Sequence, residues 1–135
     1  MSARASDVVF CMRSLNTADQ GVSANTIMSV ITPEYVPGLF SFSIVITLLG
    51  ISPVSPHHFE LCFGPIDCEP EKFTAELVPN VGTTTGNLPD DYQGINVAID
   101  LNNFNFAKSG LYQLVVFVDS ERVTEKQIYV KGKNE

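Results

Sequence analysis

Apolar and polar side chains alternate along several short segments of this sequence. In residues 39–49, Phe40, Phe42, Ile44 and Ile46 fall on one parity, and two serines and a threonine fall on the other. Alternation with a period of two over this length predicts a half-buried β-strand with its aromatic face turned inward. Shorter runs of the same character predict strands at residues 7–15, 26–31, 59–63, 72–77 and 95–101.

The segment 111–118 differs because both its even-numbered and its odd-numbered positions are apolar. The even-numbered positions, on one face, are Tyr112, Leu114, Val116 and Val118. The odd-numbered positions, on the other face, are Leu111, Val115, Phe117 and the polar Gln113. Such a strand is central in its sheet, or its outer face is covered. A polar turn at 119–121 then leads into a return strand, 123–130, whose charged side chains are typical of a sheet edge.

Turn signals separate these segments, and a helical period is absent throughout, which predicts an all-β fold. We expect a two-sheet antiparallel β-sandwich of seven to nine strands with immunoglobulin-like or Greek-key connections; a jelly roll or closed barrel is the alternative. Residues 1–135 form one domain by size, with flexible ends at 1–6 and 132–135, a long surface loop at 79–92 and a corner at 102–110. The predicted core consists of Phe40, Phe42, Ile44, Ile46, Phe59, Leu61, Phe63, Ile95, Val97, Ile99, Leu114 and Val116.

The run Ser109-Gly110-Leu111-Tyr112 resembles the start of strand F in immunoglobulin-like domains. The resemblance implies a structural role for Gly110 and Tyr112, with the tyrosine hydroxyl bonded to backbone within residues 101–108. Lys108 stands where that family has an acidic residue, and Leu114 stands where it has a disulfide cysteine, so the antibody-type disulfide is excluded. The chain also resembles small bacterial single-domain proteins of unknown function, a likeness that implies no activity.

Net charge and cysteine content indicate which partners and which cellular compartment the sequence favours. Eight basic residues against fifteen acidic ones give a net charge of −7, which disfavours binding to nucleic acid. The N-terminus lacks the apolar region of a signal peptide, and the longest apolar stretch, 39–51, is too short to span a bilayer. Three cysteines, an odd number, argue against a secreted disulfide scaffold. We therefore expect a cytoplasmic protein with reduced thiols and no membrane partner.

One group of residues resembles a metal site: His57, His58, Cys62 and Cys68. Imidazoles and thiolates bind zinc, but this spacing is not that of a common zinc motif, and adjacent histidines on a strand point to opposite faces. The acidic residues Asp67, Glu69, Glu71, Asp90 and Asp91 also suggest a hard cation, but acidic loops are ordinary in so acidic a chain. We expect solvated side chains and reduced thiols at these positions, with no metal and no cofactor.

No nucleophile–base motif, phosphate-binding loop or metalloprotease motif is present, so we expect no enzyme and nominate no catalytic residue. The sequence favours a non-catalytic binding or assembly module that meets a protein partner or a second copy of itself. The alternative is a metal or carbohydrate binder that uses the acidic loops or the region from His57 to Cys68. Because Leu111, Val115 and Phe117 need a cover, they form the candidate interface. Either the loop 79–92 or the second subunit of a homodimer provides that cover.

Overall fold

The computed structural model describes residues 3–17, 21–52, 55–77, 88–89 and 92–135. In this part of the chain there are nine β-strands and no α-helix. They are β1 (Arg4–Thr17), β2 (Gly21–Met28), β3 (Val30–Ile31), β4 (Gly38–Leu49), β5 (His57–Pro65), β6 (Glu71–Leu77), β7 (Gly94–Phe106), β8 (Gly110–Val118) and β9 (Glu121–Val130). The described residues contain no helix with the length and hydrophobicity that a membrane span requires.

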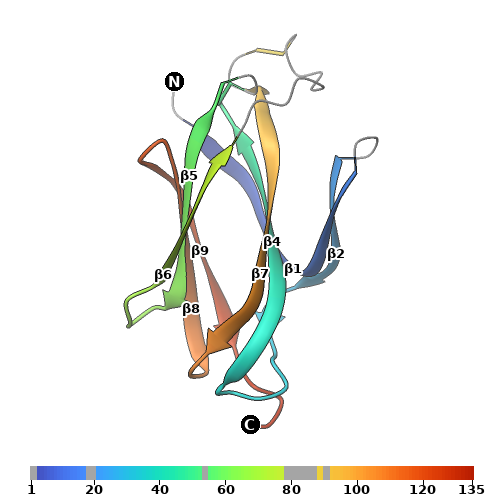
Figure 1. Ribbon diagram of the computed structural model, residues 1–135, viewed down its shortest axis with the longest axis vertical. Coiled ribbons are helices and arrows are strands. Elements are labelled where there is room, and N and C mark those ends of the chain that lie inside the picture. The colour runs from blue at the N-terminus through green and yellow to red at the C-terminus, as the bar shows by residue number, and fades with distance from the viewer. Residues whose placement is uncertain (1–2, 18–20, 53–54, 78–87, 90–91) are drawn as a thin grey trace.

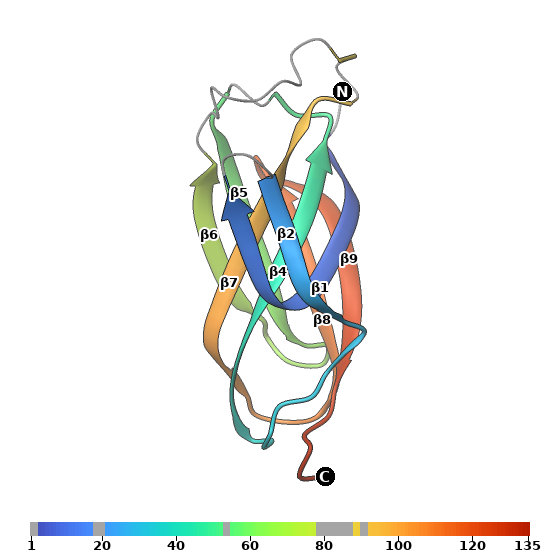
Figure 2. The ribbon, with the colours of Figure 1, turned by 90° about the vertical axis from the view of Figure 1, so that its right-hand side faces the viewer.

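The strands form two sheets that pack face to face (Figures 1 and 2). One sheet has the order β2-β1-β4-β7, and the other has the order β3-β9-β8-β5-β6. All pairs are antiparallel except β3 with β9, which is parallel. The all-β, two-sheet sandwich predicted from the alternating pattern is confirmed.

The core lies between the two sheets and is rich in phenylalanine. Nine of the twelve predicted core residues are buried, and the other three, Phe40, Ile95 and Ile99, are partly buried against the same cluster. Phe63 is central: its ring centroid lies 5.2 Å from that of Phe104 and 5.6 Å from that of Tyr112. Aromatic pairs at these separations add to the stabilisation from buried area alone.

The corner before β8 forms as the immunoglobulin-like resemblance implied. The hydroxyl of Tyr112 donates a hydrogen bond to the carbonyl of Lys108 (2.7 Å), and the Tyr112 side chain is almost fully buried. Gly110 has a φ of 134°, a conformation that residues with a Cβ rarely adopt. Leu114, where the family has a cysteine, is simply a buried core residue.

The corner is shorter than predicted, because β7 continues to Phe106. Its pairing with β4 shifts register between Phe40 and Phe42, and Asn103 adopts a left-handed φ of 55°. This bulge interrupts the alternation along β7, so the pattern falsely indicated that the strand ended near residue 101. The connection to β8 is only residues 107–109.

The strand predicted at 26–31 is two strands in different sheets. β2 ends at Met28 beside β1, and β3 begins at Val30 beside β9. The first part of β2 was missed because it is an edge strand with little apolar alternation. β9 is an edge along most of its length, as predicted, but β3 pairs with its last two residues.

The described residues near both chain ends pair with other parts of the fold. Residues 4–6 already belong to β1, where Arg4 and Ala5 pair with the end of β4. At the other end, the amide of Lys133 donates to the carbonyl of Pro33 (2.8 Å). The side chain of Asn134 accepts a bond from the amide of Val36 (3.2 Å). These long-range hydrogen bonds hold residues 132–135 against the connection between β3 and β4.

Candidate interaction surface

The two faces of β8 have opposite environments. Tyr112, Leu114, Val116 and Val118 point into the sandwich and are buried. Leu111 is 37% exposed, and Val115 and Phe117 are half-buried on the outside of the sheet. The described residues therefore leave the outer face of β8 in contact with solvent. Most of the loop 79–92, one of the two predicted covers, lies outside the described residues.

Neighbouring segments extend this apolar face. Tyr129 of β9 lies directly opposite Leu111 in the strand pairing and is 51% exposed. Ile66 follows β5, donates its amide to the carbonyl of Leu111 (3.0 Å) and is 47% exposed. We call Ile66, Leu111, Val115, Phe117 and Tyr129 the β8 outer face. Exposed apolar side chains that gather on one face commonly mark an interaction site.

Charged residues flank the β8 outer face on both sides. The strand register places Glu125, Val115, Cys62 and Lys72 in one row across four strands. Glu125 at one end of the row contacts Arg122 and Gln113, and Lys72 at the other end lies 3.4 Å from Glu60. The face thus has an apolar centre and a polar rim with an acidic–basic pair at each side, an arrangement typical of protein interfaces.

A shallow cavity of about 180 Å³ opens on the same face. Its lining includes Cys62, Cys68, Ile66 and Val115. All three cysteines of the chain are free thiols. Burial raises the pKa of the Cys62 thiol, and the nearby Glu60 charge raises it further, which favours the protonated, unreactive form.

The four residues that the sequence suggested as possible zinc ligands do not point toward one common site. Cys62 and Cys68 line the cavity on the outer face, whereas His57 points inward with its side chain 11% exposed. His58 points outward, where its Nδ1 lies 2.7 Å from Glu76 Oε1. Within the described ranges no group of three or more metal-binding side chains is found.

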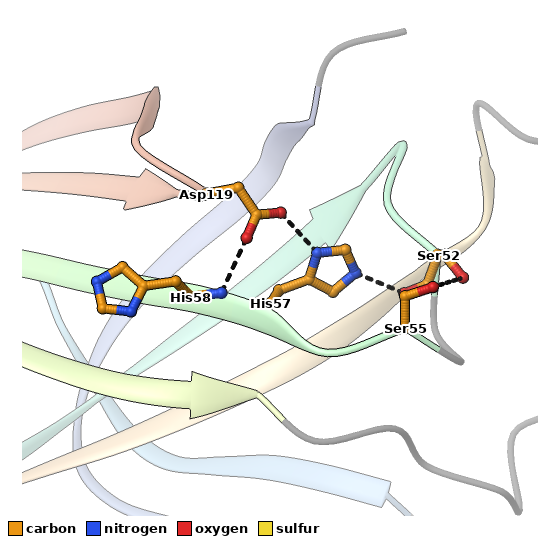
Figure 3. A network of polar contacts seen from close by, with 5 residues as sticks. All are labelled: Ser52, Ser55, His57, His58 and Asp119. Carbon is orange, nitrogen blue, oxygen red and sulfur yellow. Dashed lines mark hydrogen bonds and ion pairs between the residues drawn. The ribbon is translucent and has the colours of Figure 1, made fainter.

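His57 instead lies at the centre of a hydrogen-bond network at one end of the sandwich (Figure 3). Its Nδ1 is 2.7 Å from Asp119 Oδ2, and its Nε2 is 2.8 Å from the carbonyl oxygen of Ser52. The other oxygen of Asp119 accepts the amide of His58 (2.9 Å), and the amide of Asp119 donates to the carbonyl of His58 (2.8 Å). We call His57, Asp119 and the Ser52 carbonyl the His57 network.

Both ring nitrogens of His57 face acceptors, so both must donate, and the imidazolium form suits the geometry. Burial lowers the pKa of His57, but the hydrogen bonds to Asp119 and to the Ser52 carbonyl outweigh it, and the pKa is raised overall. The pKa of Asp119 is lowered by the bond from His57 and by that from the His58 amide. Because Nε2 faces a carbonyl and not a hydroxyl, His57 has no free lone pair to serve as a general base in this arrangement.

The sequence had indicated Asp119 only as a turn residue, so its role in the His57 network was missed. Asp119 and Ser120 form the two-residue turn between β8 and β9, and both have positive φ values, 50° and 68°. Two consecutive non-glycine residues in this conformation are unusual, although aspartate tolerates it better than most. The clue in the sequence is the absence of the glycine that such a hairpin turn usually contains.

The acidic residues named from the sequence have separate environments. Asp67 binds Lys108 (2.7 Å), and the hydrogen bond from that lysine lowers the pKa of Asp67. Glu69 and Glu71 line a groove of about 240 Å³ together with Phe104 and Asn105. The sequence gave no sign of this groove, because its walls come from segments more than thirty residues apart. Asp90 and Asp91 lie outside the described residues.

Comparisons with known proteins return structural likeness only. No protein-family model and no curated protein matches the sequence. An immunoglobulin-like protein of Pseudomonas aeruginosa is similar over 97% of this chain and 98% of its own, with 14% identity and a TM-score of 0.48. An alkylpurine DNA glycosylase of Pseudomonas fluorescens, solved with DNA containing an abasic site analogue, is similar over 92% of this chain, with 13% identity and a TM-score of 0.45.

The chain spans only 30% of the length of that glycosylase. Identities this low carry neither activity nor partners from one protein to another. The chain itself is an immunoglobulin-like β-sandwich by its two-sheet architecture and its tyrosine corner.

Proposed function

We propose that this protein is a non-catalytic assembly module that forms a homodimer through the β8 outer face. The single observation that carries the proposal is the partial exposure of Leu111, Val115 and Phe117 on a strand whose other face is core. A sandwich strand needs only one apolar face to fold, so the second apolar face serves a different contact.

The charges beside this face favour a second copy as the partner. If a two-fold axis runs along the strands between β8 and β5, it reverses the row Glu125–Val115–Cys62–Lys72 in the facing copy. Glu125 then lies opposite Lys72 of the second copy, and Val115 lies opposite Cys62. This row of the face is therefore complementary to itself, as an isologous interface requires, and the same axis places Phe117 opposite Glu60 of the second copy. An interface of ordinary size buries ~800 Å² per partner.

The proposal also includes the absence of catalytic activity and a cytoplasmic location. The geometry of His57 supports a structural role, since both of its ring nitrogens are engaged. The free thiols of Cys11, Cys62 and Cys68 suit a reducing cytoplasm.

Light scattering at micromolar concentration tests the proposal with two aspartate variants. Wild type should have the mass of two chains, and Phe117→Asp should have the mass of one because a charge cannot be buried without a partner. Ile27→Asp is the matched control, since Ile27 is 69% exposed on β2, away from the β8 outer face. That variant should remain dimeric. A monomeric wild type, or a dimeric Phe117→Asp with an unchanged circular dichroism spectrum, would refute the proposal.

One observation favours a second candidate function, carbohydrate binding. The groove lined by Glu69, Glu71, Asn105 and Phe104 offers carboxylates and an amide beside an aromatic residue, which suits the hydroxyl groups of a neutral sugar. Titration with neutral oligosaccharides should then shift the amide resonances of Glu71 and Asn105. Unchanged resonances at millimolar sugar would exclude this function.

A further inference from the structure

The His57 network joins three segments that are distant in the sequence. His57 opens β5, Ser52 belongs to the connection from β4 to β5, and Asp119 lies in the turn between β8 and β9. Figure 3 shows the imidazole between the carboxylate and the connection, with Ser55 beside Ser52. His57 thus links Ser52 to the β8–β9 turn, while the amides of Gly50 and Ile51 bond separately to the carbonyl of Gln93.

The two contacts of His57 respond differently to its protonation. In the imidazolium, Nδ1 donates to Asp119 and Nε2 donates to the Ser52 carbonyl. The neutral ring has one N–H, so one of these nitrogens must direct a lone pair at an oxygen lone pair. The carboxylate is the stronger acceptor, and it keeps the remaining proton. The contact with the Ser52 carbonyl is therefore the one that is lost.

The charged groups near His57 come from β5, β6, β9 and the β8–β9 turn. Asp119 lies in direct contact, and Glu121 follows it at the start of β9. His58 and Glu60 lie on β5, and Glu76 of β6 pairs with His58 on the outer surface. No titratable residue occurs in the β4–β5 connection from Gly50 to Pro56. Asp119 is thus the single charged side chain in contact with the ring among the described residues.

We propose that His57 is a pH-operated switch that donates a hydrogen bond to the Ser52 carbonyl when protonated and loses that bond when neutral. The β8–β9 turn retains its hold on β5 in both states, because Asp119 also exchanges two backbone hydrogen bonds with His58. The switch therefore acts on the bond to Ser52 and leaves the β8–β9 hairpin in place. This inference is independent of the proposed dimer.

Nuclear magnetic resonance titration of the full chain tests the switch. The side-chain resonances of His57 should titrate with a midpoint above 6.5, and the amide resonances of Ser52 and Ser55 should change with the same midpoint. Asp119→Asn should lower that midpoint, because it removes the charge while asparagine tolerates the positive φ at this position. His57→Gln should abolish the transition at Ser52 and Ser55.

His58→Gln is the matched control, since His58 is the only other histidine and its partner is Glu76. That variant should keep the transition at Ser52 and Ser55 with its midpoint unchanged. A His57 midpoint at or below 6.5, or amides of Ser52 and Ser55 that do not follow the His57 titration, would overturn the inference. Persistence of the transition in His57→Gln would overturn it equally.

Discussion

The hydroxyl of Tyr112 donates a 2.7 Å hydrogen bond to the carbonyl of Lys108, four residues earlier in the chain. This bond closes the short connection of residues 107–109, by which the chain passes from β7 in one sheet to β8 in the other. The ring of Tyr112 also packs against Phe63 and Phe106, with centroids 5.6 and 5.3 Å away. The corner therefore fixes the strand that presents the β8 outer face.

Replacing Tyr112 by phenylalanine should destabilise the protein by about 1 kcal/mol or slightly more. The ring contacts remain, but the Lys108 carbonyl loses its donor in a partly buried site. Urea unfolding curves give the difference in free energy of unfolding. Tyr35→Phe is the control, because Tyr35 is 68% exposed and lies outside the β8 outer face, and its stability should stay within experimental error of wild type. Equal stabilities for Tyr112→Phe and wild type would mean that the corner bond contributes nothing.

The central phenylalanine cluster should dominate the stability of the sandwich. Phe42→Ala should cost about 3–5 kcal/mol, because the ring is fully buried between Phe10, Phe63, Phe104 and Phe106 and leaves a cavity. Leu39→Ala, on the same strand but 64% exposed, should have little effect. Thermal or chemical denaturation of the two variants measures the contrast. Similar losses for both would contradict the assignment of the core.

Stability should depend on pH through the His57 network, with opposite signs for its two members. The folded-state pKa of His57 is raised above 6.5, so its contribution is complete below that pH and is lost as the pH rises through the folded-state value. The folded-state pKa of Asp119 is lowered below 3.8, so its contribution is present above that pH and is lost as the pH falls through the folded-state value. The network should stabilise most between these two pH values.

Comparing unfolding free energies of wild type and His57→Gln across this range isolates the effect. Their difference should be largest between about pH 4 and 6.5 and should shrink in alkaline solution. A difference that is constant with pH, or that grows above neutrality, would show that His57 contributes only by packing.

The three thiols should react in the order of their exposure. Cys68 is exposed and should be alkylated first, Cys62 is half-buried, and Cys11 has 0% exposure and should react only after unfolding. Burial also raises the pKa of the Cys11 thiol, which removes the reactive thiolate. Mass spectrometry after timed alkylation under native conditions reads the order. Early labelling of Cys11 would place it at the surface and contradict the packing of β1.

How far the sequence predicted this structure depends on how different the two faces of each strand are. β4 was predicted nearly to the residue because Phe42, Ile44 and Ile46 alternate with polar positions. The beginning of β2 was missed because an edge strand with both faces half-exposed has no such contrast. The end of β7 was misplaced because the bulge at Asn103 breaks the period of two.

The sequence predicted only part of the proposed interaction surface, for a related reason. Leu111, Val115 and Phe117 are neighbours on one strand, so their parity already marked them as a face. Ile66 and Tyr129 join this face only through strand pairing. The contact of His57 with Asp119 joins residues 62 positions apart, and no local pattern predicts it.

The most direct test of the account is whether the β8 outer faces of two copies touch in solution. Isotope-filtered nuclear Overhauser spectroscopy on an equal mixture of labelled and unlabelled chains detects only contacts between copies. We expect cross-peaks between the methyl groups of Leu111 in one copy and Ile66 in the other, and between the methyl groups of Val115 in one copy and Cys62 in the other. A mixture without intermolecular cross-peaks at micromolar to millimolar concentration, or cross-peaks confined to Ile27 and β2, would contradict it.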